Sequence, residues 1–211
     1  MASLEGDAPD LQRLEWAVAS KPIPGETVLG DACLVQRRRD GALLAVADGL
    51  GHGPEAAKAA EMAIGILKVS GDEDIPSLFR RCDLALKNTR GIVLSLATIN
   101  FDSRVLEWAG IGNVASILLR RPAEGGPTHR RLAPVPGLLG DYARVPRMES
   151  IPMLPGDTLL FATDGISQSF ADDLEPLLSS SPQRVAGHVL EENWRGNDDA
   201  LVLVARYKGK S

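Results

Sequence analysis

Runs of apolar residues divide the chain into short segments separated by polar or glycine-rich turns. Short apolar runs bounded by turn residues are typical of buried strands. The segments with this pattern are EWAVAS at 15–20, ACLVQR at 32–37, ALLAVAD at 42–48, IVLSLATINF at 92–101, VLEWAGIG at 105–112, VASILLRR at 114–121, DTLLFATD at 157–164 and ALVLVARY at 200–207. Asp40-Gly41 predicts a hairpin turn, and the three segments between 92 and 121 predict an antiparallel meander.

Three other segments carry helical signals. Pro54 occupies the first-turn position that proline favours, and the alanine-rich residues after it predict a helix ending near Gly71. A second helix is predicted from about 75 to 90, and a third over 183–194. Residues 121–150 resemble loops with short extended pieces. Two early helices, a long antiparallel series and a late helix indicate an α+β fold in which packed sheets carry helices outside.

Composition limits the classes of protein that remain. The chain has 211 residues, 44% hydrophobic and 24% charged, which suits one globular domain; we expect a loose leader over 1–13 and a single domain over 14–208. The sequence shows no membrane-spanning run and no signal peptide, so a cytoplasmic protein without membrane contact is expected. A net charge of −5 argues against nucleic acid as a partner.

Aspartates stand at the ends of several predicted strands. They are Asp31, Asp48, Asp164, Asp198 and Asp199. Aspartate at a strand end is common in turns, so each one alone is explained as a turn or cap residue. Sheet ends can also gather side chains from remote segments, and clustered carboxylates repel unless a cation neutralises them. If these groups meet, Mg²⁺ or Mn²⁺ is the natural partner, because both prefer oxygen ligands and two such ions can promote phosphoryl transfer.

Six motifs follow one another between residues 16 and 207. They are GDA at 30–32, VADGLGHGPEA at 46–56, AGIGN at 109–113, PVPGLLG at 134–140, TLLFATDGISQ at 158–168 and NDDALVLVAR at 197–206. Together they resemble the metal-dependent protein phosphatase family (PPM, type 2C-like), and within it the bacterial RsbX-like branch. The resemblance implies an αββα sandwich, with two central antiparallel sheets flanked by helices. It also implies hydrolysis of phosphoserine or phosphothreonine with two Mn²⁺ or Mg²⁺ ions.

The resemblance further implies a role for each matching residue. Asp48 would bridge the two metal ions. The carboxylate of Asp31 and the backbone carbonyl of Gly49 would complete the protein ligands of one ion. Asp164 and Asp198 would hold the other ion, so Asp48 and Asp164 count as both metal-binding and catalytic residues.

Several positions depart from the family pattern. Asp199 stands where the family often has asparagine, so we assign it a supporting role in the second shell. Many relatives have a phosphate-binding arginine upstream of the first acidic ligand, but here Lys21 is the nearest base before Asp31. Leu50 takes the place of the family's general-acid histidine, and His52 lies two residues further on. His52 is a candidate general acid because imidazole suits proton transfer near neutral pH; a structural histidine bonded to backbone is the alternative.

The resemblance implies a substrate class as well. The expected substrates are phosphorylated STAS-domain proteins of the stressosome, and the expected enzyme is a monomer that resets a stress signal. Two alternatives stay open. One is the same enzyme acting on a phosphorylated anti-sigma antagonist, and the other is a non-catalytic phosphoprotein-binding module, because a fold alone does not fix activity. Retention of the aspartates argues against the second alternative.

Overall fold

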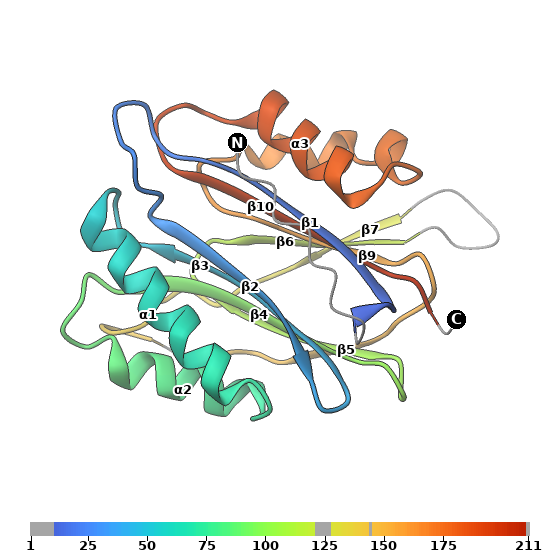
Figure 1. The fold of residues 1–211 in the computed structure, drawn as a ribbon, viewed down its shortest axis with the longest axis horizontal. Helices are drawn as coiled ribbons and strands as arrows, with labels where there is room; N and C mark the ends of the chain where they lie inside the picture. The colour runs from blue at the N-terminus through green and yellow to red at the C-terminus, as the bar shows by residue number, and fades with distance from the viewer. Residues whose placement is uncertain (1–10, 121–127, 144, 210–211) are drawn as a thin grey trace.

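Two antiparallel sheets stack face to face, and helices cover their outer faces (Figure 1). The computed structural model describes residues 11–120, 128–143 and 145–209, and within them each sheet has five strands. Sheet A contains, in spatial order, β1 (Leu14–Lys21), β10 (Ala200–Tyr207), β9 (Thr158–Ala162), β6 (Ala115–Arg120) and β7 (Thr128–Leu132). Sheet B contains β2 (Asp31–Arg38), β3 (Gly41–Gly49), β4 (Ile92–Asn100), β5 (Val105–Ile111) and β8 (Glu149–Pro152).

The helices divide between the two outer faces. Helices α1 (Pro54–Ser70) and α2 (Ile75–Ala85) pack on sheet B. Helix α3 (Pro182–Asn193) packs on sheet A, together with the 3₁₀ helix η2 (Gln168–Asp173); a second one, η3 (Glu175–Leu177), follows η2. This layer order confirms the αββα sandwich expected from the sequence.

Strand β3 shows why the central strands are apolar throughout. Successive side chains point to opposite faces, so Leu44 and Val46 enter the core between the sheets, whereas Leu43 and Ala45 face the helices. Both faces are buried, which removes the polar alternation of a half-exposed strand. The largest fully buried side chains between the sheets are those of Trp108, Phe161 and Tyr207.

The predicted meander is wrong in its last step. Strands β4 and β5 pair as expected, but β6 crosses to sheet A and pairs with β7 and β9, while β8 lies beside β5. The link between β5 and β6 contains Gly112, whose φ of +104° lies in a region that glycine tolerates and other residues avoid. A Cβ there would also lie 2.1 Å from Val93 Cγ1. The apolar pattern could not reveal the crossing, because central strands of both sheets are buried on both faces.

Helix α2 also ends earlier than predicted. It stops at Ala85, although the sequence predicted a helix to about residue 90. The Leu86 backbone N–H donates to the Cys82 carbonyl, and the Thr89 hydroxyl donates to the Leu86 carbonyl. These bonds close the helix end and leave the following residues as a turn before β4.

The residues before β1 and the segment between β6 and β8 were expected to be a loose leader and loops with short extended pieces. Residues 1–10 of the expected leader lie outside the described residues, but Leu11 is buried between the sheets and the Lys208 N–H donates to the Arg13 carbonyl. Leu11 and Arg13, which the sequence assigned to the leader, therefore contact the sandwich. Strands β7 and β8 are the short extended pieces expected within 121–150, of which 121–127 and 144 lie outside the described residues. No helix in the described ranges is long and apolar enough to cross a membrane.

Candidate metal centre

The five aspartates singled out from the sequence come together at one end of the sandwich. Asp31 opens β2 and lies directly opposite Asp48 on β3, in the same register pair of sheet B. Asp164 follows β9, and Asp198 and Asp199 precede β10, both in sheet A. The β1–β2 connection, the start of α1 and the α3–β10 connection surround this end, on the left in Figure 1. The site is thus assembled from two sheets and from segments far apart in sequence.

Hydrogen bonds fix the two halves of the site to each other. The Thr163 hydroxyl of sheet A donates to Asp31 Oδ2 of sheet B at 2.7 Å, and accepts from the Leu201 backbone N–H at 2.8 Å. The buried Asp199 carboxylate accepts from the backbone N–H groups of Ile23, at 2.8 Å, and Gly30, at 2.7 Å. Asp199 therefore holds the β1–β2 connection against β10, which agrees with a supporting position outside the ligand set.

The glycine-rich loop after β3 lies tightly against helix α1. A Cβ on Gly49 would lie 2.2 Å from the Ala56 carbonyl oxygen, so only glycine allows this approach. Gly51 and Gly53 have φ values of +85° and +76°, and Gly53 is the N-cap of α1. The loop thereby turns sharply from Asp48 into the helix.

Burial and mutual repulsion raise the pKa values of Asp31, Asp48 and Asp198. The pKa of Asp31 is raised to about 8, mainly by burial and also by the nearby charges of Asp199, Asp164 and Asp198, while the hydrogen bond from the Thr163 hydroxyl lowers it. Burial, followed by the charges of Asp31 and the other three, raises the pKa of Asp48 well above its usual range. The pKa of Asp198 is also raised, mainly by burial, while the Asp199 N–H and His52 lower it.

The donor set fits hard divalent cations. Among the described residues, no Lys or Arg side chain forms an ion pair with any of the five aspartates. Like charges directly opposite on paired strands, as at Asp31 and Asp48, are destabilising unless a cation lies between them. Within the same residues no three His, Cys, Asp or Glu side chains are already arranged around one point. The set is thus an all-oxygen cluster, typical of Mg²⁺ or Mn²⁺ ligands, that a cation would draw together.

His52 lies at the rim of the cluster rather than inside it. Its side chain is 56% exposed, and its Nδ1 is 3.2 Å from Glu26 Oε1 in the β1–β2 connection. The observed partner is a carboxylate, not the backbone group that the structural alternative proposed. Its charge still reaches Asp198, whose pKa it lowers.

Sequence analysis missed two residues that contact the candidate ligands. The Asn113 side-chain amide donates to Asp164 Oδ2 at 2.9 Å, and Thr163 binds Asp31 as described above. Both lie inside the quoted motifs, since Asn113 ends AGIGN and Thr163 precedes Asp164 in TLLFATDGISQ. The signal was therefore present, but pattern alone gives no side-chain direction.

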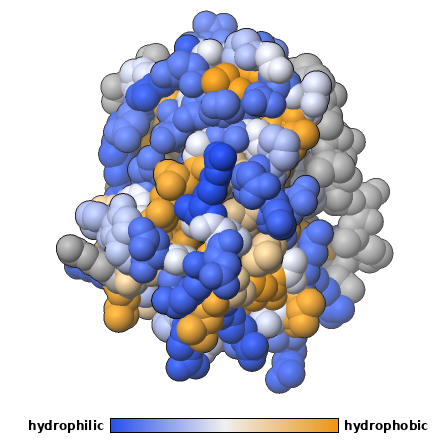
Figure 2. All heavy atoms as spheres, turned by 90° about the vertical axis from the view of Figure 1, so that its left-hand side faces the viewer, coloured by the Kyte–Doolittle hydropathy of each residue, from blue (hydrophilic) through white to orange (hydrophobic). Residues whose placement is uncertain are grey.

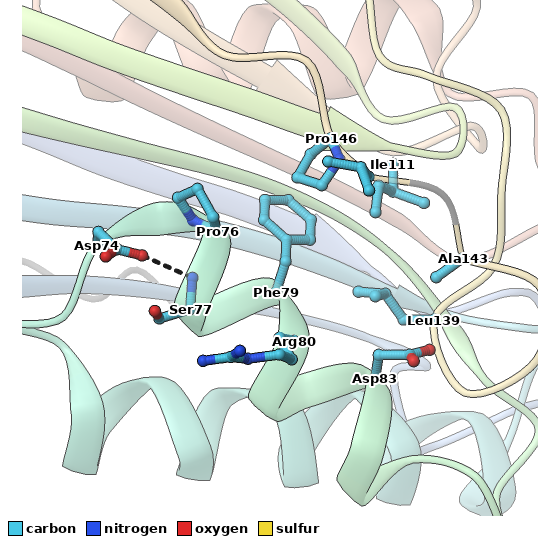
Figure 3. Close-up of a pocket in the computed structure, with 11 residues that line it drawn as sticks. Asp74, Pro76, Ser77, Phe79, Arg80, Asp83, Ile111, Leu139, Ala143 and Pro146 are labelled. Carbon is cyan, nitrogen blue, oxygen red and sulfur yellow. Dashed lines mark hydrogen bonds between the residues drawn. The ribbon is translucent and has the colours of Figure 1, made fainter.

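The surroundings of the site are mixed in polarity. Figure 2 looks onto this end and shows hydrophilic and hydrophobic side chains next to each other; Leu50, in the loop after Asp48, is 53% exposed. A pocket of about 480 Å³ lies between α2 and a segment that contributes Leu139, Ala143 and Pro146 (Figure 3). Its carboxylates have other partners, because Asp74 caps α2 through the Ser77 N–H and Asp83 accepts from the Gly140 N–H. That pocket is separate from the metal centre.

Comparisons with known proteins agree with this geometry. A family model described as Stage II sporulation protein E (SpoIIE) matches residues 38–208. Phosphoserine phosphatase RsbX of Bacillus subtilis (strain 168) is 28% identical over 145 residues, 68% of this chain and 70% of that protein. A chain described under "The bacterial stressosome: a modular system that has been adapted to control secondary messenger signaling" is 32% identical, with a TM-score of 0.84 over 92% of this chain and 100% of its own length.

A further solved structure supports the fold. RsbX crystallised in complex with magnesium is 22% identical, with a TM-score of 0.82 over 97% of this chain and 99% of its own length. The two five-stranded sheets and their helices, counted over the described ranges, therefore have the architecture of known phosphatases.

Proposed function

Because the chain belongs to the SpoIIE family, whose model covers residues 38–208, we propose that it is a metal-dependent phosphoserine and phosphothreonine protein phosphatase. The observation that carries the proposal is the meeting of five aspartates from two sheets at one end of the sandwich. Clustered carboxylates without a neutralising cation repel one another, and their oxygen atoms suit divalent cations. The similarity to the phosphoserine phosphatase RsbX gives the reaction class.

The proposal assigns the ligands as the motif resemblance implied. Asp48, Asp31 and the Gly49 carbonyl would hold one ion, and Asp48, Asp164 and Asp198 would hold the other. Two Mn²⁺ or Mg²⁺ ions, when bound, would activate a water molecule and neutralise the phosphate. The magnesium in the RsbX structure supports this choice of cation.

The remaining contacts of the chain keep these ligands in place. Thr163 orients Asp31 through its hydroxyl, and Asn113 orients Asp164 through its amide. Asp199 fixes the β1–β2 connection through two backbone N–H groups. Hydrogen bonds of this kind hold the ligand side chains in fixed positions. Catalysis depends on this, because the reacting groups must be in place before the reaction begins.

His52 is proposed as the proton donor to the leaving serine or threonine oxygen. Its exposure and its position beside the cluster leave it open to a bound phosphoprotein, and its Nδ1 lies 3.2 Å from Glu26 Oε1. Its alternative is a purely structural contact that fixes the glycine-rich loop to the β1–β2 connection.

The proposed substrates are phosphorylated STAS-domain proteins of the stressosome, with a cytoplasmic monomer as the enzyme. The RsbX similarity and the stressosome chain at 32% identity support the partner class. The two free cysteines, Cys33 and Cys82, are compatible with a reducing compartment. Light scattering after size-exclusion chromatography tests the monomer.

The decisive experiment is release of phosphate from phosphorylated STAS proteins encoded in the same genome, with and without Mn²⁺. We expect Mn²⁺-dependent release that chelator abolishes and that Asp48→Asn loses. If phosphate is released only from a phosphorylated anti-sigma antagonist, that protein becomes the proposed substrate and the enzyme class stays the same. Tight binding of the phosphoproteins without release from any of them would instead identify a binding module.

A further inference from the structure

The early end of α2 brings an arginine to the glycine-rich loop that follows Asp48. Beyond the helix, the Thr89 hydroxyl accepts from the Gly91 N–H at 3.0 Å, which fixes the turn that carries Arg90. Gly91 then begins the approach to sheet B, because its carbonyl accepts from the Leu50 N–H at 3.1 Å. Ile92 lies opposite Gly49 in the register of β4 and β3. Arg90 is therefore two residues from a direct neighbour of a candidate metal ligand.

The Arg90 side chain reaches back over the glycine-rich loop. A Cβ built on Gly51 would lie 3.3 Å from Arg90 Nη1, so the guanidinium lies over the middle of the loop between Asp48 and α1. The side chain is exposed, and in the described part of the chain it has no hydrogen bond or ion pair. A guanidinium that lies over the loop after Asp48, without a partner among the described residues, has its donors available to a ligand.

Two other cations near the site have partners already. The Lys21 ammonium lies 3.9 Å from the centroid of the Trp194 ring, and His52 faces Glu26. The stretch between Lys21 and Asp31 contains no arginine, so the upstream position gives no guanidinium for a phosphate. Arginine suits a phosphate group because its planar fork donates two parallel hydrogen bonds to two oxygens.

We propose that Arg90 binds the phosphate of the substrate, delivered from the α2–β4 turn rather than from the strand before Asp31. The inference rests on the proposed phosphatase function and adds a substrate-binding residue to it. Arg90 contacts none of the aspartates, so its role is to hold the phosphoryl group, and the metal ions bind without it.

The test compares Arg90→Ala, Arg90→Lys and the matched control Lys87→Ala. Lys87 is in the same turn, is exposed, and has only a 4.0 Å ion pair with Asp83, so its loss removes the same charge from the same segment. The measurements are KM for a phosphoserine peptide and Ki for inorganic phosphate. We expect Arg90→Ala to raise both about 10- to 100-fold, the loss typical of a charge-assisted hydrogen bond. The KM and Ki of Arg90→Lys should lie between those of the wild type and Arg90→Ala, and those of Lys87→Ala should stay near the wild-type values.

Two thermal-shift measurements separate the remaining outcomes. The increase in melting temperature caused by Mg²⁺ alone should be equal in all variants, whereas the additional increase caused by inorganic phosphate should vanish in Arg90→Ala. Equal phosphate binding by Arg90→Ala and Lys87→Ala would overturn the inference, and so would a lost Mg²⁺ effect in Arg90→Ala. If the wild type hydrolyses nothing, the proposed function fails, and the phosphate-induced shift still decides whether Arg90 binds phosphate.

Discussion

Replacing Asp48 by asparagine should change the way in which pH and metal ions control the stability of the fold. Asp31 and Asp48 face each other across β2 and β3, and burial raises the pKa of Asp31 to about 8. A carboxyl whose pKa is higher in the folded than in the unfolded state favours folding while it is protonated. That contribution is lost as the pH rises from about 4 to about 8. The metal-free protein should therefore become less stable over this range.

The size of the effect follows from the same pKa. A rise from 3.8 to about 8 corresponds to an upper bound on the order of 5 kcal/mol at pH 8. One ion at about 100 times its dissociation constant adds about 2.7 kcal/mol to the folded state, so two ions restore a similar amount. For a chain of this size, each ion corresponds to an increase of roughly 5–10 °C in the melting temperature. Metal should thus compensate the repulsion at high pH and matter little near pH 5, where protons compete for the carboxylates.

The assay is thermal unfolding from pH 5 to pH 8, with chelator or with Mn²⁺. The melting temperature of the metal-free wild type should fall as the pH rises from 5 to 8, and the increase in melting temperature caused by Mn²⁺ should be largest at pH 8. Asp48→Asn removes one of the opposed charges, so its metal-free melting temperature should fall less with pH and respond weakly to Mn²⁺. Asp102→Asn, an exposed change in the turn at the far end of β4, is the control. A flat or rising metal-free profile, or an unchanged Mn²⁺ effect in Asp48→Asn, would refute the reasoning.

Three further outcomes follow from other contacts. Thr163→Val should destabilise the fold by about 1–3 kcal/mol, because it leaves the Leu201 N–H and the Asp31 carboxyl without their partner; chemical denaturation measures this, and a loss below 0.5 kcal/mol would contradict it. His52→Ala should slow hydrolysis of phosphoserine by ~10²–10⁴-fold but that of an activated aryl phosphate much less, whereas equal losses would favour the structural alternative. Cys33 and Cys82 should resist alkylation by iodoacetamide at pH 7.5 in the folded protein, because burial raises their thiol pKa values to about 11 and about 12. Mass spectrometry measures the fraction alkylated, and rapid alkylation of the folded protein would argue against this.

The sequence predicted the acidic centre well because strand ends have few possible places. Each aspartate closes or opens an apolar strand, and in a two-sheet sandwich such ends can lie only at one rim or the other. The family resemblance then predicted that all five aspartates lie at the same rim of the sandwich. Direct pairing of Asp31 with Asp48 follows from the hairpin at Asp40-Gly41, since a tight turn fixes the register of both strands.

The sequence could not predict where α2 ends, because the residues after Ala85 could either continue the helix or form a turn. The residues after Ala85 are mostly helix formers, so propensity extends α2 to Arg90. The Thr89 hydroxyl instead caps the Leu86 carbonyl, and Gly91, at φ +80°, redirects the chain into β4. Periodicity of apolar residues does not contain that information, because it depends on where β4 must begin in sheet B.

The division of the centre between two sheets links its chemistry to the core of the fold. Sheet B alone holds Asp31 and Asp48, and sheet A alone holds Asp164, Asp198 and Asp199. Neither half contains all of the proposed ligands, so the proposed ligand set can come together only once the inter-sheet core has formed. Thr163 and Asp199 then join the halves through buried hydrogen bonds. Because binding energy gained only by the folded state stabilises that state, the cations that complete the site also hold the two sheets together.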